Sequence, residues 1–312
     1  MPSPNRRDFL KTSALFATAT TLSKLTFAQN TRSTPKLNLF SKHLQFLGYQ
    51  ELAETAKSIG FDGIDLTVRP GGHVLPERVE QDLPKVVDAC REQGLETPMM
   101  TTTVEDADDP LDQAVLITAS QVGIDFYRMN WLRYEEDISM PDSLQLCRER
   151  IQKLDSLNQK LGIVGCYQNH AGTLVGASPW EVWQILQDAS PEQFGAQYDI
   201  RHATVEGGRS WPNGLRLLND RIKTIVIKDF KWVLEDGRTR LVNTPLGEGM
   251  VDFPNYFRRL KDAKIDAPIS FHFEYELGGA ESGLREISKS PEFVFEAMRR
   301  DIATFKRLWT EA

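Results

Sequence analysis

The fold is decided by the stretch Gly60-Phe61-Asp62-Gly63-Ile64-Asp65-Leu66-Thr67-Val68-Arg69. Its short apolar run, residues 63–67, is bounded by turn residues on one side and a charged residue on the other, which is typical of a buried β-strand. Helical patterns precede this run near 48–59 and follow it near 79–93. A strand between two helices is the repeating unit of a parallel sheet.

The same alternation continues along the chain. Short apolar runs predict eight strands, at 36–40, 63–67, 96–101, 125–129, 163–167, 196–200, 224–228 and 269–275. Amphipathic patterns predict eight helices, near 48–59, 79–93, 110–121, 142–161, 178–188, 212–220, 253–262 and 291–309. Eight strands that are each followed by a helix predict an α/β protein with the (β/α)8 TIM-barrel fold.

The competing arrangement is a doubly wound open sheet. That fold usually carries a glycine-rich phosphate loop directly after its first strand. Here the first predicted strand continues into Ser41-Lys42-His43 and no GxGxxG follows. The barrel is therefore favoured, and no nucleotide cofactor is expected.

The N-terminus resembles an export signal for folded proteins. Asn5-Arg6-Arg7-Asp8-Phe9-Leu10-Lys11 has the twin-arginine pattern, and a modestly apolar run follows at 12–25. Thr26-Phe27-Ala28 ends in small residues typical of a cleavage site. We expect 1–28 to be a twin-arginine signal peptide, 29–312 to be a single domain, and the mature protein to be periplasmic. An amphipathic first helix and an uncleaved anchor are the alternatives.

The net charge of the chain limits the classes of molecule that it can be expected to bind. The chain has 37 Lys and Arg against 44 Asp and Glu, a net charge of −7. The signal segment is basic, so the mature part is still more acidic, which argues against nucleic acid and against membrane contacts beyond that segment. The three cysteines, Cys90, Cys147 and Cys166, form no zinc or disulfide pattern.

A long polar stretch at 230–244, with a hairpin tip at Asp236-Gly237, is expected to be a flap or a contact in a homo-oligomer.

Polar residues gather at the carboxyl ends of the predicted strands, where barrel enzymes place their active sites. All five histidines of the chain lie there, and so do several charged, amide and aromatic residues, among them His43, His73, His170, His202, His272, Arg69, Arg128, Trp131, Gln168, Asp199, Lys228 and Glu274. A single histidine is more often structural than catalytic. Five together at strand ends indicate a functional site.

Six short motifs give the chain a resemblance to a known family. They are Gly60-Phe61-Asp62-Gly63-Ile64-Asp65-Leu66, Gln168-Asn169-His170, Asp199-Ile200-Arg201-His202, Ile227-Lys228-Asp229, Pro245-Leu246-Gly247-Glu248-Gly249 and Phe273-Glu274-Tyr275. The chain thereby resembles the xylose isomerase-like TIM barrels known as sugar phosphate isomerases and epimerases. The resemblance covers essentially all of the mature chain.

The resemblance implies a divalent-cation site with two altered ligands. Family members hold the cation with Glu, Asp, His and Glu from strands five to eight. Asp199 and Glu274 match this pattern, whereas Gln168 replaces the first Glu and Val226 the His. The implied ligands are Gln168, Asp199 and Glu274, and the cation would be Mn²⁺, Mg²⁺, Zn²⁺ or Co²⁺. A site without metal stays open, because Gln adds no charge and Val cannot ligate.

The family's reaction removes a proton next to a carbonyl and returns it elsewhere. The resemblance implies Glu274 as the catalytic base, with Lys228 supplying positive charge to an enolate oxygen if no metal is bound. The alternative is that Glu274 pairs with Lys228 or Arg128 in a buried ion network. The residues expected to bind a small carbohydrate are His202, His170, Asn169, Arg128, Arg69, His73, Trp131 and His272.

The sequence thus predicts an exported sugar isomerase or epimerase. A lyase or hydratase acting on an oxidised sugar or glycoside is the close alternative, since it needs only one base. A non-catalytic carbohydrate-binding barrel is the alternative from another class. Export favours a substrate without a phosphate group, because sugar phosphates are mainly cytoplasmic.

Overall fold

The computed structural model describes Thr34–Ala312, which form one compact unit. The predicted signal peptide, residues 1–28, lies outside the described residues. Among the residues that are described, no helix combines the length and the apolar character needed to cross a membrane.

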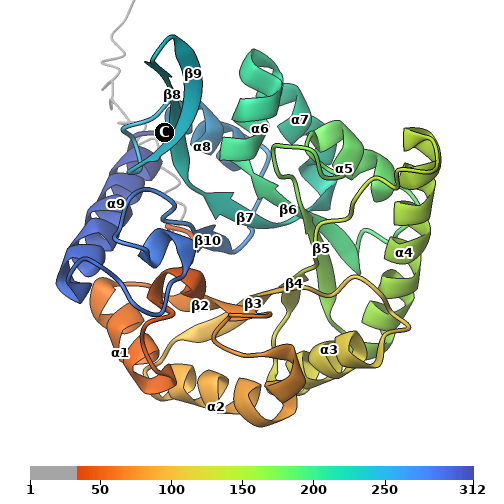
Figure 1. Cartoon of the computed structure of the whole chain (residues 1–312), viewed down its shortest axis with the longest axis horizontal. Coiled ribbons are helices and arrows are strands. Elements are labelled where there is room, and N and C mark those ends of the chain that lie inside the picture. The colour runs from red at the N-terminus through yellow and green to blue at the C-terminus, as the bar shows by residue number, and fades with distance from the viewer. Residues whose placement is uncertain (1–33) are drawn as a thin grey trace, which may run out of the picture. The chain divides into compact units, whose positions relative to one another are not determined.

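Eight parallel strands close into a barrel in the order β1-β10-β7-β6-β5-β4-β3-β2 (Figure 1). They are β1 (Leu37–Phe40), β2 (Gly63–Val68), β3 (Glu96–Thr102), β4 (Phe126–Arg128), β5 (Val164–Gln168), β6 (Phe194–Asp199), β7 (Ile222–Ile227) and β10 (Ile269–Phe271). Closure leaves no free sheet edge, so every strand finds backbone partners on both sides. The predicted (β/α)8 barrel is confirmed, and the open sheet is excluded.

Helices surround the barrel and cover the outer faces of its strands (Figure 1). They are α1 (Tyr49–Ile59), α2 (Val79–Glu92), α3 (Pro110–Val122), α4 (Met140–Leu161), α5 (Pro179–Ile185), α6 (Ile200–Gly207), α7 (Trp211–Leu218), α8 (Phe253–Asp262) and α9 (Pro291–Glu311). Several begin with a Ser or Asp side chain that accepts backbone N–H groups, followed by a proline in the first turn. This combination satisfies N–H groups that a helix start otherwise leaves unpaired.

Most strand boundaries differ from the sequence prediction by one or two residues, and two of the strand ends have a clear physical cause. Strand β6 ends at Asp199 rather than Ile200, because the Asp199 carboxylate accepts the His202 N–H and starts α6. Strand β10 ends at Phe271 rather than Tyr275. There the Phe273 N–H donates to His43 Nε2 at 3.0 Å instead of to a strand carbonyl, so the ladder stops.

The predicted hairpin is present as β8 (Asp229–Glu235) and β9 (Arg238–Thr244), paired antiparallel at the rim of the barrel (Figure 1). Its turn places Asp236 at φ 50° and Gly237 at φ 71°. Two successive positive φ angles define the tight turn that Asp-Gly favours. The hairpin tip at Asp236-Gly237 is therefore confirmed.

One carboxylate fastens the loop after this hairpin to the barrel. Asp229 is buried and accepts the N–H groups of Phe230, Gly247, Gly249 and Val251 at 2.8–3.2 Å. A side chain at Gly249 would place its Cβ 2.2 Å from Asp229 Oδ1, so only glycine fits. The Lys-Asp and Leu-Gly-Glu-Gly motifs of the sequence thus form a single structural unit beside Lys228.

We expect Asp229→Ala to lower the free energy of unfolding by about 2–4 kcal/mol, because the N–H groups of the buried Phe230 and Val251 and of the two loop glycines lose this acceptor. Asp262→Ala, at an exposed position of α8, is the matched control and should change it by less than about 0.5 kcal/mol. Urea denaturation measures both. Equal stability of the two variants would contradict the role assigned to Asp229.

Candidate active site

A small cavity opens at the carboxyl end of the barrel, with a volume of about 50 Å³. Side chains from the ends of β1, β2, β4, β5, β7 and β10 line it: Phe40, Lys42, Arg69, Arg128, Trp131, Gln168, His170, Lys228, His272 and Glu274. The structure thus brings together eight of the predicted site residues. Asp199 and His202 are buried next to this lining, where Asp199 contacts Gln168 and Lys228 and His202 contacts His170, and Asn169 is buried behind them against the Asp199 backbone.

Lys228 occupies the centre of the site. Its ammonium lies 3.2 Å from Asp199 Oδ2 and 3.2 Å from Glu274 Oε2. The Lys228 and Asp199 side chains are almost fully buried, whereas Glu274 keeps 23% of its side chain exposed. One cation therefore neutralises part of the charge on two carboxylates, and we call Asp199, Lys228 and Glu274 the lysine-centred triad.

Gln168 completes the surroundings of Asp199. Its Nε2 donates to Asp199 Oδ2 at 2.8 Å, and its Oε1 accepts from Arg128 Nη1 at 3.3 Å. Because a carboxylate can only accept and a guanidinium can only donate, these two contacts determine the orientation of the amide. The oxygen that would ligate a cation points towards Arg128, away from Asp199.

The predicted ligands do not fit a divalent cation in this arrangement. Asp199 Oδ2 already accepts Gln168 and contacts Lys228, and its Oδ1 accepts the His202 N–H at 3.1 Å. Val226 offers no donor on the neighbouring strand. Among residues 34–312, no group of three His, Cys, Asp or Glu side chains is placed to hold a metal ion. A cation between Asp199 and Glu274 would have to displace the Lys228 ammonium.

Glu274 is the carboxylate that faces the cavity. Burial raises its pKa, but the Lys228 ammonium and then His272 hold the pKa well below its usual range. His272 Nδ1 lies 3.5 Å from Glu274 Oε1, close to it but without a well-formed hydrogen bond. Glu274 is therefore ionised at neutral pH and can accept a proton.

Stacked rings form the walls beside the triad. His170 lies 3.9 Å from the His202 ring and 4.5 Å from that of Trp131, and His272 stacks on Phe40 at 4.1 Å. Burial lowers the pKa of His170 to about 4 and that of His272 to about 3. These imidazoles are therefore neutral at neutral pH, so they can offer hydrogen bonds but no charge.

Two predicted binding residues hold the framework instead of lining the cavity. His73 contacts Ser41 Oγ and the Leu44 carbonyl, each at 3.2 Å, and ties the turn after β2 to the segment that follows β1. Asn169 donates to the Asp199 carbonyl at 2.9 Å and accepts the Asp199 N–H at 2.8 Å. Asn169 thereby sets the position of Asp199 at the end of β6.

Two lining residues stand outside the predicted set, Phe40 and Lys42. Phe40 is the last residue of β1, and its only sequence signal is its place at a strand end. Lys42 belongs to no family motif. Phe40 became recognisable only when β10 was paired with β1, which brings it beside His272, whereas Lys42 stood at a predicted strand end and a structural role was expected for it.

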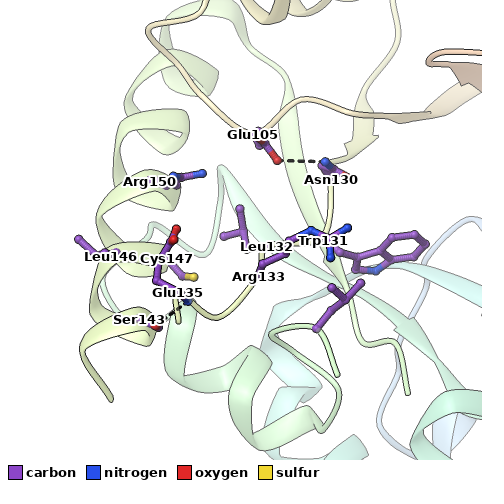
Figure 2. A pocket seen from close by; sticks show the side chains of 11 residues that line it. Glu105, Asn130, Trp131, Leu132, Arg133, Glu135, Ser143, Leu146, Cys147 and Arg150 are labelled. Carbon is purple, nitrogen blue, oxygen red and sulfur yellow. Dashed lines mark hydrogen bonds between the residues drawn. The ribbon is translucent and has the colours of Figure 1, made fainter. Parts of the chain in front are cut away.

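A larger cavity of about 370 Å³ lies between α4 and the segments after β3 and β4. Figure 2 shows that Asn130 and Glu105 face each other across its edge, where they hydrogen-bond at 3.0 Å, while the Trp131 ring points away from Ser143 and Cys147. No member of the lysine-centred triad lines this cavity. We therefore place the chemistry in the smaller cavity, where the ionised groups converge.

The sequence of the barrel matches a known protein family. The profile of the xylose isomerase-like TIM barrel family matches residues 53–294. The chain belongs to that family. No functionally curated sequence matches the chain significantly.

Solved structures share the barrel at low sequence identity. The 3-keto-D-glucoside 4-epimerase of E. coli matches with a TM-score of 0.64 and 13% identity, covering 88% of this chain and 100% of its own. A probable 3-DHS dehydratase from Bacillus anthracis matches with a TM-score of 0.62 and 13% identity, covering 85% and 98%. A family member from Mycobacterium smegmatis in complex with magnesium matches with a TM-score of 0.62 and 13% identity, covering 88% and 98%.

Replacing Lys228 tests the triad. Lys228→Met leaves Asp199 and Glu274 buried without their cation, and we expect it to cost about 3–5 kcal/mol of unfolding free energy at neutral pH. Lys42→Met, a half-buried lysine with no ion pair among residues 34–312, should cost less than about 1 kcal/mol.

The loss of stability in Lys228→Met should depend on pH. Burial already raises the pKa of Asp199, and Lys228 opposes that effect, whereas Lys228 holds the pKa of Glu274 low. Without the ammonium, both folded pKa values should rise, so the native state of the variant binds more protons and its stability falls as pH rises. The deficit relative to the wild type should therefore be larger at about pH 8 than at about pH 5. Urea denaturation at both pH values measures it. A deficit that does not change with pH would contradict the proposed charge balance.

Proposed function

We propose that the protein is a carbohydrate-modifying enzyme that transfers a proton next to a carbonyl. In this proposal the Lys228 ammonium supplies the positive charge that a divalent metal ion is expected to supply in relatives of this fold. The observation that carries the proposal is the placement of Lys228 between Asp199 and Glu274, at 3.2 Å from each. Both a charged electrophile and an ionised base are thereby available in one cavity.

The reaction would run on one base. The Glu274 carboxylate takes the proton from the carbon beside the substrate carbonyl, and the electron pair of that C–H bond moves to give an enolate. The negative charge on the enolate oxygen is stabilised by Lys228, with neutral imidazole N–H groups nearby. A substrate oxygen that draws Lys228 away from Glu274 also weakens the contact that lowers the pKa of the carboxylate, so its basicity increases.

The fate of the enolate decides the reaction class. If the carbon that lost its proton carries a hydroxyl group, the proton of that hydroxyl moves to the enolate oxygen and a new carbonyl forms there. Return of the proton from Glu274 to the former carbonyl carbon then gives an isomer. Expulsion of a hydroxyl group, which leaves as water with that proton, gives a dehydrated product. Gln168 cannot act as a second base on the opposite face. The site therefore supports isomerisation or elimination better than epimerisation through two carboxylates.

The comparisons support the substrate class. One structural relative is named an epimerase of a keto-glucoside, and others are named D-psicose 3-epimerase and a dehydratase. The names indicate that this barrel serves proton transfer on carbohydrates and related ring compounds. We also propose that residues 1–28 direct the protein to the periplasm through the twin-arginine route, which the Arg6-Arg7 motif supports.

Proton exchange is the direct test. In D₂O, we expect the wild type to incorporate deuterium next to the carbonyl of at least one member of a panel of ketoses and keto-glycosides, detected by NMR. Glu274→Gln should slow the exchange by about 10²–10⁴-fold, because the variant lacks the base. EDTA should leave the rate unchanged.

Glu276→Gln is the matched control, since Glu276 is exposed two residues away and lies outside the cavity lining. Its exchange rate should equal that of the wild type. Sugar binding with no exchange on the whole panel would favour the non-catalytic carbohydrate-binding barrel. Loss of exchange in EDTA, with recovery on adding a divalent cation, would contradict the role of Lys228.

A further inference from the structure

Three cationic side chains on one side of the active-site cavity lack an acidic partner. They are Lys42, Arg69 and Arg128, from the ends of β1, β2 and β4. None of them lies within 4.0 Å of a carboxylate oxygen among the residues that the structure describes. This separates them from Lys228, which has two carboxylate partners.

Arg128 is the most enclosed of the three. Its side chain is buried, its Nη1 donates to Gln168, and its Nε has no hydrogen-bond partner. The guanidinium lies 4.1 Å from the centre of the Trp131 ring. Burial, and then the neighbouring Arg69, lower the pKa of Arg128 to about 9, against the opposite effect of Asp65.

Arg69 and Lys42 extend this positive surface. The Arg69 guanidinium lies 5.7 Å from the centre of the Phe40 ring. An aromatic face, and not a carboxylate, is therefore the neighbour of this cation. Burial lowers the pKa of Lys42, and Lys228 and Arg69 lower it further against the effect of Glu274. Both side chains are half-buried and free of hydrogen bonds within residues 34–312, so they can adjust to a bound group.

The nearby acids do not balance these charges. Four cationic side chains line the cavity and Glu274 is its only carboxylate. Lys228 already contacts Glu274 and Asp199. Asp65 lies deeper, where its carboxylate accepts from Ser270 and Thr101, and it makes no ion pair within 4.0 Å of Lys42, Arg69 or Arg128.

Burying cations without a counter-charge is costly, and an oxyanion supplied by a ligand removes this cost. We propose that Lys42, Arg69 and Arg128 form an anion subsite, and that the substrate of the lysine-centred triad carries a carboxylate or a phosphate group. The inference rests on the proposed function, because it assigns the substrate class of the same site. Guanidinium groups suit both anions, since their N–H groups match the spacing of two oxygens.

The position of the subsite orients the substrate. The anion would lie between Lys42 at the end of β1 and the arginines at the ends of β2 and β4, whereas Lys228 and Glu274 follow β7 and β10, and β10 lies opposite β4 in the barrel. The carbonyl of the bound molecule would therefore face the triad. A cavity of about 50 Å³ admits a group of carboxylate size, and the rest of the molecule would extend towards the opening as Lys42 and Arg69 move outwards.

Matched probes test the subsite by binding alone. Isothermal titration calorimetry compares D-glucuronate and D-glucose 6-phosphate with D-glucose, which lacks the anionic group but keeps the ring. We expect at least one anionic probe to bind about tenfold or more tighter than D-glucose, and its affinity to fall as salt rises from about 50 to about 500 mM.

Substitutions of the two arginines test whether the anion binds at this subsite. Arg69→Gln and Arg128→Met should each weaken anion binding by about tenfold. Arg69 is half-buried and tests the proposal even if Arg128→Met fails to fold. Arg133→Gln is the control, because Arg133 is exposed and lines the separate cavity of Figure 2. Its anion affinity should match that of the wild type.

Each outcome bears on the proposal. Tighter binding of D-glucuronate identifies a carboxylate, and tighter binding of D-glucose 6-phosphate identifies a phosphate. Equal affinity for all three probes, no binding of either anion, or unchanged affinity in Arg69→Gln would overturn the subsite. Glu274→Gln should still bind the anion, so anion binding without any proton exchange would contradict the proposed function alone. Proton exchange with no preference for anionic keto-sugars would contradict the subsite alone.

Discussion

The site depends on one interaction, the contact of the Lys228 ammonium with Asp199 and Glu274. These residues lie at the carboxyl ends of three consecutive barrel strands, with β10 beside β7 and β7 beside β6. Two carboxylates this deep would repel each other and lose hydration without a positive group between them. The lysine therefore makes the arrangement stable, and it also leaves Glu274 ionised at the cavity wall.

The altered family positions are consistent with this arrangement. A glutamate in place of Gln168 would put a third negative charge beside Asp199, which one lysine could not balance. As an amide, Gln168 instead donates to Asp199 and accepts from Arg128, linking the triad to the cationic side of the cavity. Val226 adds apolar packing on β7, where a ligand would have no cation to hold. The substitutions and the central lysine thus form a coherent set.

Much of this could be predicted from the sequence, because each strand is a short apolar run and each connection carries a helical period. The end of the barrel that holds the site was also predictable, since polar residues collect at the carboxyl ends of strands. The individual contacts were not. Nothing in the local sequence separates His73, which ties one turn to the segment after β1, from His170, which lines the cavity. The meeting of Phe40 with His272 depends on the pairing of β1 with β10, which only barrel closure creates.

Titration of the purified wild-type protein with Mn²⁺ tests most directly whether the lysine replaces a cation. The account predicts no saturable binding with a Kd below about 1 mM, because the ion would have to displace a buried ammonium from both of its carboxylates. Binding of one equivalent of Mn²⁺ with a Kd of about 1 μM would contradict it, since that affinity requires a preformed set of ligands around the ion.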